Sequence, residues 1–465
     1  MKITGGHLPK IAGRPLSTVE EISPPDKLYI SLNRCGVNYK PVVKSGQKIN
    51  FGATLAVASI TGGKLSLPSP ASGKVLIDEG EDKVPHRLII ETAEKDITTG
   101  TYDKLQPERV TSQTVRNTLA KSGVWPFFWS SLTDGTPTLD ENEKPRAIII
   151  NTVLAEPFRT RGKVVLRREW KQIVQGIKFL PRLLADYGTV EIILTAKRDP
   201  VARMMYVDLA GFARLHFHPV PLLYPVENPK ILSHALRKSD SSFKKDDVIW
   251  EIDIQGMVAI GACLSEGLPL HRRILALGGP GISDPKHVSV RIGTPFKHLL
   301  PQNYSSEDVL ILRGGLLKGE PIIPDTDSVG YDDDSLFFLP EMKKRKLINF
   351  MRPGFNRTSS LPCFASQLTG ASDSEISTSL RGERRPCIAC GICERVCPAG
   401  LMPQVIHRYL YREAIDEAEA VGLDLCIFCG LCTYVCPSKV ELQKQFKESL
   451  EQLRLEHEEA AASVS

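Results

Sequence analysis

The chain has 465 residues, of which 42% are hydrophobic and 24% charged, and its formal net charge is +5. This composition is ordinary for about three or four globular domains, and the mild positive charge does not indicate nucleic-acid binding. The N-terminus has no signal-peptide pattern, and no apolar run reaches the ~18 residues that span a bilayer. We therefore expect a soluble or peripheral cytoplasmic protein that other subunits would have to hold at a membrane.

Residues 1–104 have the pattern of an all-β region. "PVVKSGQKINFGATLAVA" and "LSLPSPASGKVLIDEGE" alternate short apolar runs with glycine turns. These stretches resemble the lipoyl/biotinyl barrel-sandwich, in which carrier proteins modify a lysine in a tight hairpin. Lys64 sits in the turn here without a signature such as MKM or DKA around it. We expect this region to be structural, with no lipoyl or biotinyl group.

Residues 105–235 alternate helical and strand patterns, which favours an α/β core. "TSQTVRNTLAKSG" predicts a helix capped by Thr111 or Ser112 and ended by Gly123. "RAIIINTVLA", "TVEIILTA" and "LHFHPVPLLYP" are apolar runs typical of buried parallel strands. Between the first two we expect an amphipathic helix that Pro181 kinks or restarts.

Residues 236–325 continue as mixed α/β, and residues 326–380 indicate an irregular linker. In the linker, "DTDSVGYDDD" is acidic and "KKRK" is basic, and opposite charge runs this close are typical of solvated loops, with a subunit contact as the alternative. From Arg381 the chain is expected to be helical around its cysteine motifs. It ends in a charged helix.

Eight of the eleven cysteines lie in two short stretches, which favours metal or redox use over disulfides in a long chain of this kind. The other three, Cys35, Cys263 and Cys363, stand alone. We expect each of them to be a small buried hydrophobic residue.

Both stretches have the pattern C-x2-C-x2-C-x3-C-P, and the second begins 39 residues after the first. Three cysteines at this spacing can wrap three corners of a 4Fe–4S cubane, and the fourth, before proline, ligates the other cluster in two-cluster ferredoxins. The predicted ligands of cluster I are Cys387, Cys390, Cys393 and Cys436. The predicted ligands of cluster II are Cys426, Cys429, Cys432 and Cys397.

Two tetrahedral zinc sites are the alternative interpretation of these cysteines. Zinc knuckles are usually two separated C-x2-4-C pairs, so three cysteines in seven residues fit zinc poorly. The long helical spacer between the motifs is typical of α-helical ferredoxin modules in larger complexes. Two adjacent clusters would pass single electrons between partners, and His407 in the spacer is expected to be an ordinary polar helix residue.

The remaining sequence lacks the usual nucleotide signatures. No G-x-G-x-x-G opens a helix after a strand, and no G-x-x-x-x-G-K-[ST] occurs. The glycines of "ALGGPGISDP" and "LRGGLLKGE" are expected to make turns, with a phosphate or cofactor contact as the alternative. No acid/base pair or nucleophile constellation stands out, so catalysis by this chain alone is not predicted.

The whole-chain arrangement resembles the RnfC/NqrA family. The stretches "LPKIAGRP", "SPASGKV", "LAKSGVWP", "PRAIIINT", "LHFHPV", "DIQGMVAIG" and "ILALGGPGISDP" are similar to the NqrA subunit of Na+-translocating NADH:quinone reductases, over about residues 5–320. The two cysteine motifs resemble the C-terminal region of RnfC. The resemblance implies a multidomain α/β fold. Its parts would be a barrel-sandwich at 1–104, a Rossmann-like domain at 105–235, an SLBB-type β-grasp at 236–325, the linker at 326–380, and an α-helical ferredoxin domain at 381–465.

For function, the resemblance implies a peripheral subunit on the cytoplasmic side of the inner membrane, with membrane and redox subunits as partners. NADH would be oxidised on another subunit, and electrons would reach quinone with coupled Na+ transport. The alternatives are an RnfC-like subunit of a ferredoxin:NAD+ oxidoreductase, with ferredoxin as a partner, and a soluble electron-transfer adaptor.

Two cofactors besides the clusters are implied by the resemblance. RnfC is expected to have a glycine-rich flavin loop, but "KSGVWPFFWSS" stands in its place, and bulky side chains there argue against FMN and NADH. "NTVLAEPF", with Glu156 before Pro157, is similar to the family's acidic strand end. Quinone is a candidate ligand near Trp125, or near His216 with His218, although buried structural roles are the preferred interpretation of all three.

Overall fold

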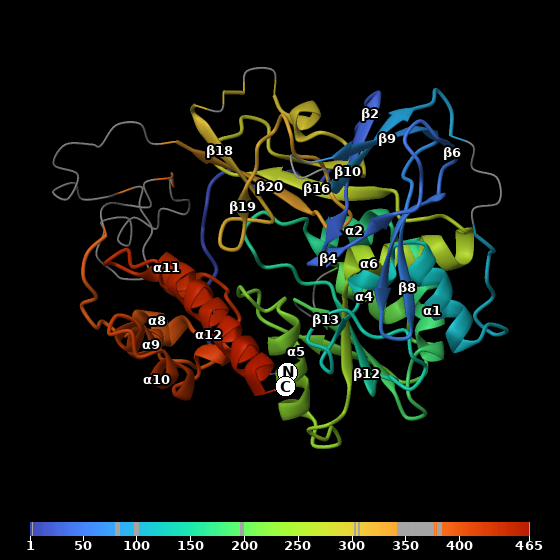
Figure 1. The fold of residues 1–465 in the computed structure, drawn as a ribbon. Coiled ribbons are helices and arrows are strands. Elements are labelled where there is room, and N and C mark those ends of the chain that lie inside the picture. The colour runs from blue at the N-terminus through green and yellow to red at the C-terminus, as the bar shows by residue number, and fades with distance from the viewer. Residues whose placement is uncertain are drawn as a thin grey trace.

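The protein is a mixed α/β molecule with several sheets and a C-terminal helical region that gathers on one side (Figure 1). The computed structural model describes residues 1, 3–79, 84–96, 102–195, 200–301, 304–305, 307–341, 355, 376, 378 and 384–464. Among the helices in these ranges, none combines the length and apolar character needed to cross a membrane.

The described N-terminal region contains three small antiparallel sheets. Their orders are β2-β10-β9-β6, β5-β7-β8, and β3-β4, the last formed by Asn33–Arg34 and Val37–Asn38. Their bounds are β2 Lys27–Ser31, β5 Lys40–Pro41, β6 Lys48–Ile49, β7 Thr54–Ile60, β8 Gly63–Pro68, β9 Gly73–Glu79 and β10 Pro85–Thr92. The β7–β8 hairpin turns at Thr61 and Gly62, so Lys64 lies inside β8, opposite Ser59, and not in the turn as predicted.

The central sheet has the order β11-β15-β12-β13-β14, and all of its strands except the edge strand β11 are parallel. Its bounds are β11 Trp129–Ser130, β12 Ala147–Asn151, β13 Thr189–Leu194, β14 Leu215–Pro219 and β15 Ile249–Asp253. Strands β12 and β13 are buried at every position, as continuous apolar runs predict. Strand β15 follows residue 236, so this sheet extends past the predicted boundary.

Six helices accompany the central sheet. They are α1 Ser112–Lys121, α2 Gly162–Arg168, α3 Trp170–Phe179, α4 Pro200–Asp208, α5 Pro229–Ser239 and α6 Ile254–Gly261. The Thr111 hydroxyl caps α1 by accepting from the Thr114 N–H, and Gly123 has a positive φ just after the helix. Helix α3 stops at Phe179, and Pro181 lies in a short 3-10 turn, in agreement with the predicted break.

A six-stranded sheet of order β1-β17-β16-β20-β18-β19 lies beside these parts. Its bounds are β1 Val19–Glu21, β16 Arg272–Gly278, β17 Lys286–Arg291, β18 Val309–Arg313, β19 Glu320–Pro321 and β20 Ser335–Pro340. Strand β20 lies in the stretch where the sequence predicts an irregular linker. It is buried because it pairs with both β16 and β18. In the sequence, the acidic residues before β20 make its short apolar run resemble part of a loop.

The C-terminal region is helical. Its helices are α8 Ile392–Val396, α9 Pro403–Leu410, α10 Ile415–Ala420, α11 Leu431–Val435 and α12 Leu442–Val464. They surround their own apolar core, which includes Ile406, Ala418, Leu423 and Phe446 together with cysteines of both motifs. A second apolar core joins this region to the body, so the C-terminal helices are packed onto the rest of the chain.

Candidate functional site

The two cysteine motifs fold in the same way. Ala389 and Phe428, each two residues after the first cysteine, have φ values of 53° and 49°. Gly391 and Gly430, four residues after it, have φ values of 70° and 75°. These left-handed positions curl the chain between the first three cysteines, and a short helix, α8 or α11, follows in each motif.

The first cavity in this region is surrounded by four thiols. Three come from the first motif and one from the second. The cysteines that line it are Cys387, Cys390, Cys393 and Cys436, which we call the first cysteine set. Gln404 also lines this cavity, and its side-chain oxygen accepts from the Cys393 thiol at 3.2 Å.

The second cavity has the reverse composition, with three thiols from the second motif and one from the first. The cysteines that line it are Cys397, Cys426, Cys429 and Cys432, the second cysteine set. Among the described residues, no three His, Cys, Asp or Glu side chains are placed to hold one metal ion. The thiols of each set instead surround a cavity, and a cubane needs such spacing because each thiolate binds a different iron.

Burial raises the pKa of four of these thiols, those of Cys393, Cys426, Cys429 and Cys432. It raises the pKa of Cys393 to about 11 and that of Cys429 to about 12, because a thiolate is poorly solvated there. Backbone N–H groups point at the sulfurs and oppose this effect. The Phe428 N–H lowers the pKa of Cys426 in this way. At the equivalent position of the first motif, the Ala389 nitrogen lies 3.5 Å from Cys387 Sγ. A bound metal would take the place of the thiol proton and use these N–H groups to stabilise the thiolate.

The two sets differ in their surroundings. In the first motif, Ile388 is 68% exposed and Cys390 is exposed. At the equivalent positions of the second motif, Ile427 packs in the core shared with the body, and Cys429 is only 8% exposed. The second set therefore faces the body, and the first set faces outward.

Hydrogen bonds from the body reach the ligand loops of both motifs. The Tyr224 hydroxyl donates to the Cys429 carbonyl at 2.7 Å, and the Gly6 N–H donates to the Val396 carbonyl at 2.9 Å. Neither residue was identified from the sequence. Tyr224 follows the β14 run and Gly6 lies near the chain start, so only the folded structure brings them to the cysteines.

The residues suggested for a quinone site differ in burial: Trp125 is buried, His218 is half-buried, and His216 is exposed, so the preferred buried role does not describe His216. Trp125 is fully buried, packs against Phe128 and Trp250, and donates from Nε1 to the Pro137 carbonyl at 2.9 Å. His216 and His218 flank Glu191 at 3.1 and 2.6 Å.

The isolated cysteines and His407 have different surroundings. Cys263 is fully buried as predicted, whereas Cys35 is exposed in a left-handed turn, and its thiol lies 3.3 Å from Asp332. Cys363 lies outside the described residues. His407 is a polar residue of α9, with Nδ1 2.7 Å from the Gln445 side-chain oxygen.

The glycine-rich loops pack against neighbouring protein atoms. A Cβ on Gly279 would lie 2.4 Å from the Phe338 carbonyl oxygen, and Gly279 donates its N–H to the Gly13 carbonyl. A Cβ on Gly315 would lie 2.4 Å from Cγ of Glu156. Close packing of this kind supports the interpretation of these glycines as turn residues.

Comparisons with known proteins agree with these observations. Residues 110–268 match the family model "NqrA second alpha/beta domain", and residues 386–441 match the "4Fe-4S dicluster domain". The NqrA subunit of the Na+-translocating NADH-quinone reductase of Marinomonas sp. (strain MWYL1) is 26% identical, over 90% of this chain and 91% of its own length. The proteins of the same name from Cellvibrio japonicus (strain Ueda107) and Vibrio atlanticus (strain LGP32) are both 25% identical, over 91% and 89% of this chain and 92% and 89% of their own lengths.

Among solved structures, an NAD+-reducing NiFe-hydrogenase in the air-oxidized state matches with a TM-score of 0.42 at 9% identity. The match covers 73% of this chain and 66% of the hydrogenase chain. Along most of its length the chain thus resembles the NqrA subunit of the Na+-translocating NADH-quinone reductases, and it ends in a region of the 4Fe-4S dicluster type.

Proposed function

We propose that this chain is an NqrA-like component of a Na+-translocating NADH:quinone reductase complex and that its C-terminal region carries electrons. The observation that carries the electron-transfer role is the composition of the two cavities, each with three thiols from one motif and the fourth from the other. This is the ligand pattern of a two-cluster ferredoxin. The first cysteine set would hold cluster I and the second would hold cluster II.

The chain's own residues fit the requirements of such sites. Two 4Fe–4S clusters, when bound, would supply one-electron carriers. The eight thiols would ligate them, and the N–H groups of residues such as Ala389 and Phe428 would stabilise the thiolates. Leu431 and Ile392, both buried, limit water at the base of each motif. The body contacts the second set, so the body and the outward-facing first set are the two ends of the proposed route.

The role in a complex is supported by the relatives, which are named as NqrA subunits of NADH-quinone reductases. By this similarity the chain is an oxidoreductase and translocase component that works with membrane and redox partners at the cytoplasmic face. NADH would be oxidised on another subunit, quinone would be reduced nearby, and Na+ would cross through the membrane subunits. FMN is not part of the proposal, because Trp125 and Phe128 fill the loop where a flavin phosphate would need open backbone.

For the fold, we propose the barrel-sandwich assignment for the N-terminal sheets and the Rossmann-like assignment for the parallel sheet. We propose that the six-stranded sheet is the SLBB-type β-grasp domain and that the C-terminal helices are the α-helical ferredoxin domain. The match of residues 110–268 to one family model supports moving the end of the α/β domain beyond β15.

An RnfC-like role is the second candidate, favoured by the 4Fe-4S dicluster match at residues 386–441. In that case a ferredoxin would exchange electrons with the exposed first set. The gene neighbourhood and the retention of the chain on salt-washed membranes separate both pump candidates from a soluble adaptor.

The test is anaerobic reconstitution of the purified chain, followed by iron, sulfide and flavin analysis and EPR. We expect about eight irons per chain and no flavin. Bound FMN that NADH reduces would instead favour the RnfC-like role. An unchanged iron content in the Cys390→Ser/Cys429→Ser variant would contradict the cluster assignment.

A further inference from the structure

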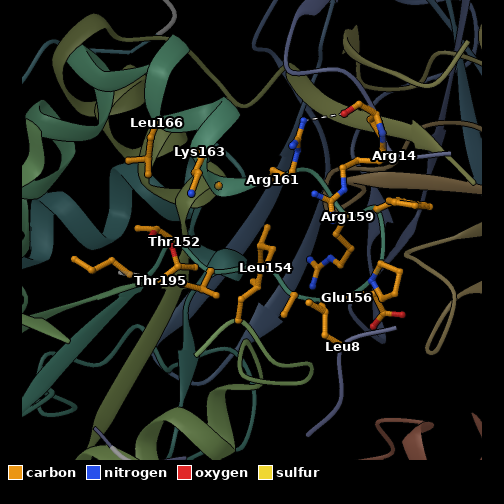
Figure 2. A pocket seen from close by; sticks show the side chains of 18 of the residues that line it. Leu8, Arg14, Thr152, Leu154, Glu156, Arg159, Arg161, Lys163, Leu166 and Thr195 are labelled. Carbon is orange, nitrogen blue, oxygen red and sulfur yellow. Dashed lines mark hydrogen bonds between the residues drawn. The ribbon is translucent and has the colours of Figure 1, made fainter. Parts of the chain in front are cut away.

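A separate cavity of about 770 Å³ lies in the body, at the carboxyl ends of β12 and β13. Figure 2 shows Arg14, Arg159 and Arg161 close together on one side of it, Leu154 in the centre, and Thr152 and Thr195 on the other side. The volume is within the range of pockets that bind small organic molecules.

The cavity occupies a place where parallel sheets bind ligands. Strand β12 pairs with β13 on one side and with β15 on the other, and the chain reaches these two neighbours in turn. From β12 the chain runs outward through β13 to β14 and then crosses back to β15 on the other side of β12. This reversal of strand order opens a crevice beyond the carboxyl end of β12. The segment that follows β12, residues 152–163, forms one wall, and the N-terminal residues 8–15 form another.

Arg14 and Arg161, on one side of the cavity, form no ion pair with a carboxylate in the described chain. Arg161 donates to the Pro15 carbonyl at 2.8 Å, while its Nε is buried without a hydrogen-bond partner. Arg14 is exposed, and no hydrogen bond or ion pair of its side chain is found within the described ranges. Burial and the nearby charges of Arg14 and Arg167 lower the pKa of Arg161, which indicates that these cations repel each other.

The nearby acids are already engaged elsewhere. Arg159 is paired with Asp334, and Glu156, the one acid in the described cavity wall, accepts from the Leu317 N–H at 2.6 Å. An anion between Arg14 and Arg161 would relieve their repulsion and satisfy the orphan Nε of Arg161.

The rest of the wall is apolar. The aliphatic side chains that line it include Leu8, Val153, Leu154, Leu166, Met205 and Leu222. Phe158 also lines it. It has a φ of 62°, which is strained for an aromatic residue, and it is held by stacking on Phe337 at 5.6 Å.

We propose that this cavity binds an organic anion, with its phosphate or carboxylate group between Arg14 and Arg161 and its apolar body against Leu154. No cysteine of the described chain lines this cavity, so the proposed anion binding does not require that the cysteines bind iron. Its relation to electron transfer rests on the proposed function. Val153 and Ala155 of the cavity wall belong to the same packed core as Tyr224 and Cys429, so this core connects the cavity wall to the second motif.

Two fluorescent probes with the same aromatic rings test the proposal on the full-length chain. 8-Anilinonaphthalene-1-sulfonate carries one negative charge, and N-phenyl-1-naphthylamine carries none. We expect the anionic probe to bind about tenfold more tightly. Arg14→Gln should remove most of this difference and leave the neutral probe unchanged, and Arg109→Gln, an exposed arginine outside the cavity, should have no effect.

Arg161→Gln is a second variant, whose fold is checked by circular dichroism because Arg161 also contacts Pro15. Competition with 1-naphthyl phosphate and 1-naphthoate then identifies the anionic group, since the preferred class displaces the probe at lower concentration. Equal affinity for both probes, or an anionic-probe affinity that Arg14→Gln leaves unchanged, would overturn the proposal. Iron content is measured in parallel, so failure here is distinct from failure of the cluster assignment.

Discussion

The buried Tyr224 hydroxyl donates a 2.7 Å hydrogen bond to the Cys429 carbonyl and so ties the body to the middle cysteine of the second motif. The two residues are 205 positions apart. The first motif has the same backbone, but its equivalent residue, Cys390, is exposed. The motif backbone therefore folds without such a hydrogen bond. The bond from Tyr224 serves to dock the second motif onto the body.

Replacing Tyr224 by Phe should loosen this docking and leave the fold of each part intact. Loss of one buried hydrogen bond costs about 0.5–1.5 kcal/mol, and the Cys429 carbonyl would be left without this donor. We expect roughly two- to tenfold faster amide exchange in α11, measured by mass spectrometry, with α8 unchanged. Tyr411→Phe, at an exposed site, is the matched control. Equal acceleration in α8 and α11 would mean that Tyr224 does not act on docking.

A pair of equivalent glycines offers a second test of docking. Gly391 and Gly430 have nearly the same φ, so alanine should cost about 1–2 kcal/mol of backbone strain at either position. A Cβ on Gly391 meets nothing within 4 Å, whereas one on Gly430 would lie 2.6 Å from the Leu317 carbonyl oxygen. We expect Gly430→Ala to loosen the packing between the body and the C-terminal region, so that limited proteolysis cuts between them. Gly391→Ala should leave this part of the chain protected from the protease. Equal protection of the two variants would contradict the close approach of Leu317.

The crossed ligation of the two cavities makes a prediction about iron content. A variant with serine at Cys426, Cys429 and Cys432 should keep about four irons, held by the first cysteine set. Adding Cys436→Ser should remove most of this iron, because Cys436 lines the first cavity. Adding Cys397→Ser instead should leave this iron bound, because Cys397 lines the second cavity. The reverse result would mean that each motif supplies all four ligands of its own cluster.

The sequence was sufficient for features that depend on local spacing. The cysteines that line each cavity are the four that the spacing grouped as ligands of one cluster, because the curl of C-x2-C-x2-C is a local property, and their binding of iron stays a prediction. The run "RAIIINTVLA" predicted the buried strand β12 for the same reason.

Features that depend on distant partners could not be predicted in this way. Strand β20 is a strand because β16 and β18 pair with it, and the acidic residues before it suggested a loop. The cluster of Arg14 and Arg161 forms only when the N-terminal segment crosses the end of β12. Arginines so far apart in a sequence give no signal of a shared cavity.

The buried carboxyl of Glu156 makes stability depend on pH. Burial raises its pKa to about 7, although the Leu317 N–H works against this shift, and burial also raises the pKa of the neighbouring Glu227. An unfolded glutamate has a pKa of about 4.3, so between about pH 4.5 and 7 the native state binds more protons than the unfolded state. Stability should therefore fall as the pH rises through this window.

Glu156→Gln removes the proton equilibrium and keeps the oxygen that accepts from Leu317. Between pH 4.5 and 7, the free energy of unfolding should fall less in the variant than in the parent chain, and the difference should reach up to about 3 kcal/mol. Calorimetry at several pH values across this range measures it. Glu441→Gln, at an exposed site, should retain the parent pH dependence. Parallel pH profiles for Glu156→Gln and the parent would show that Glu156 is ionised in the native state throughout the window, with Arg159 and Lys318 compensating its burial.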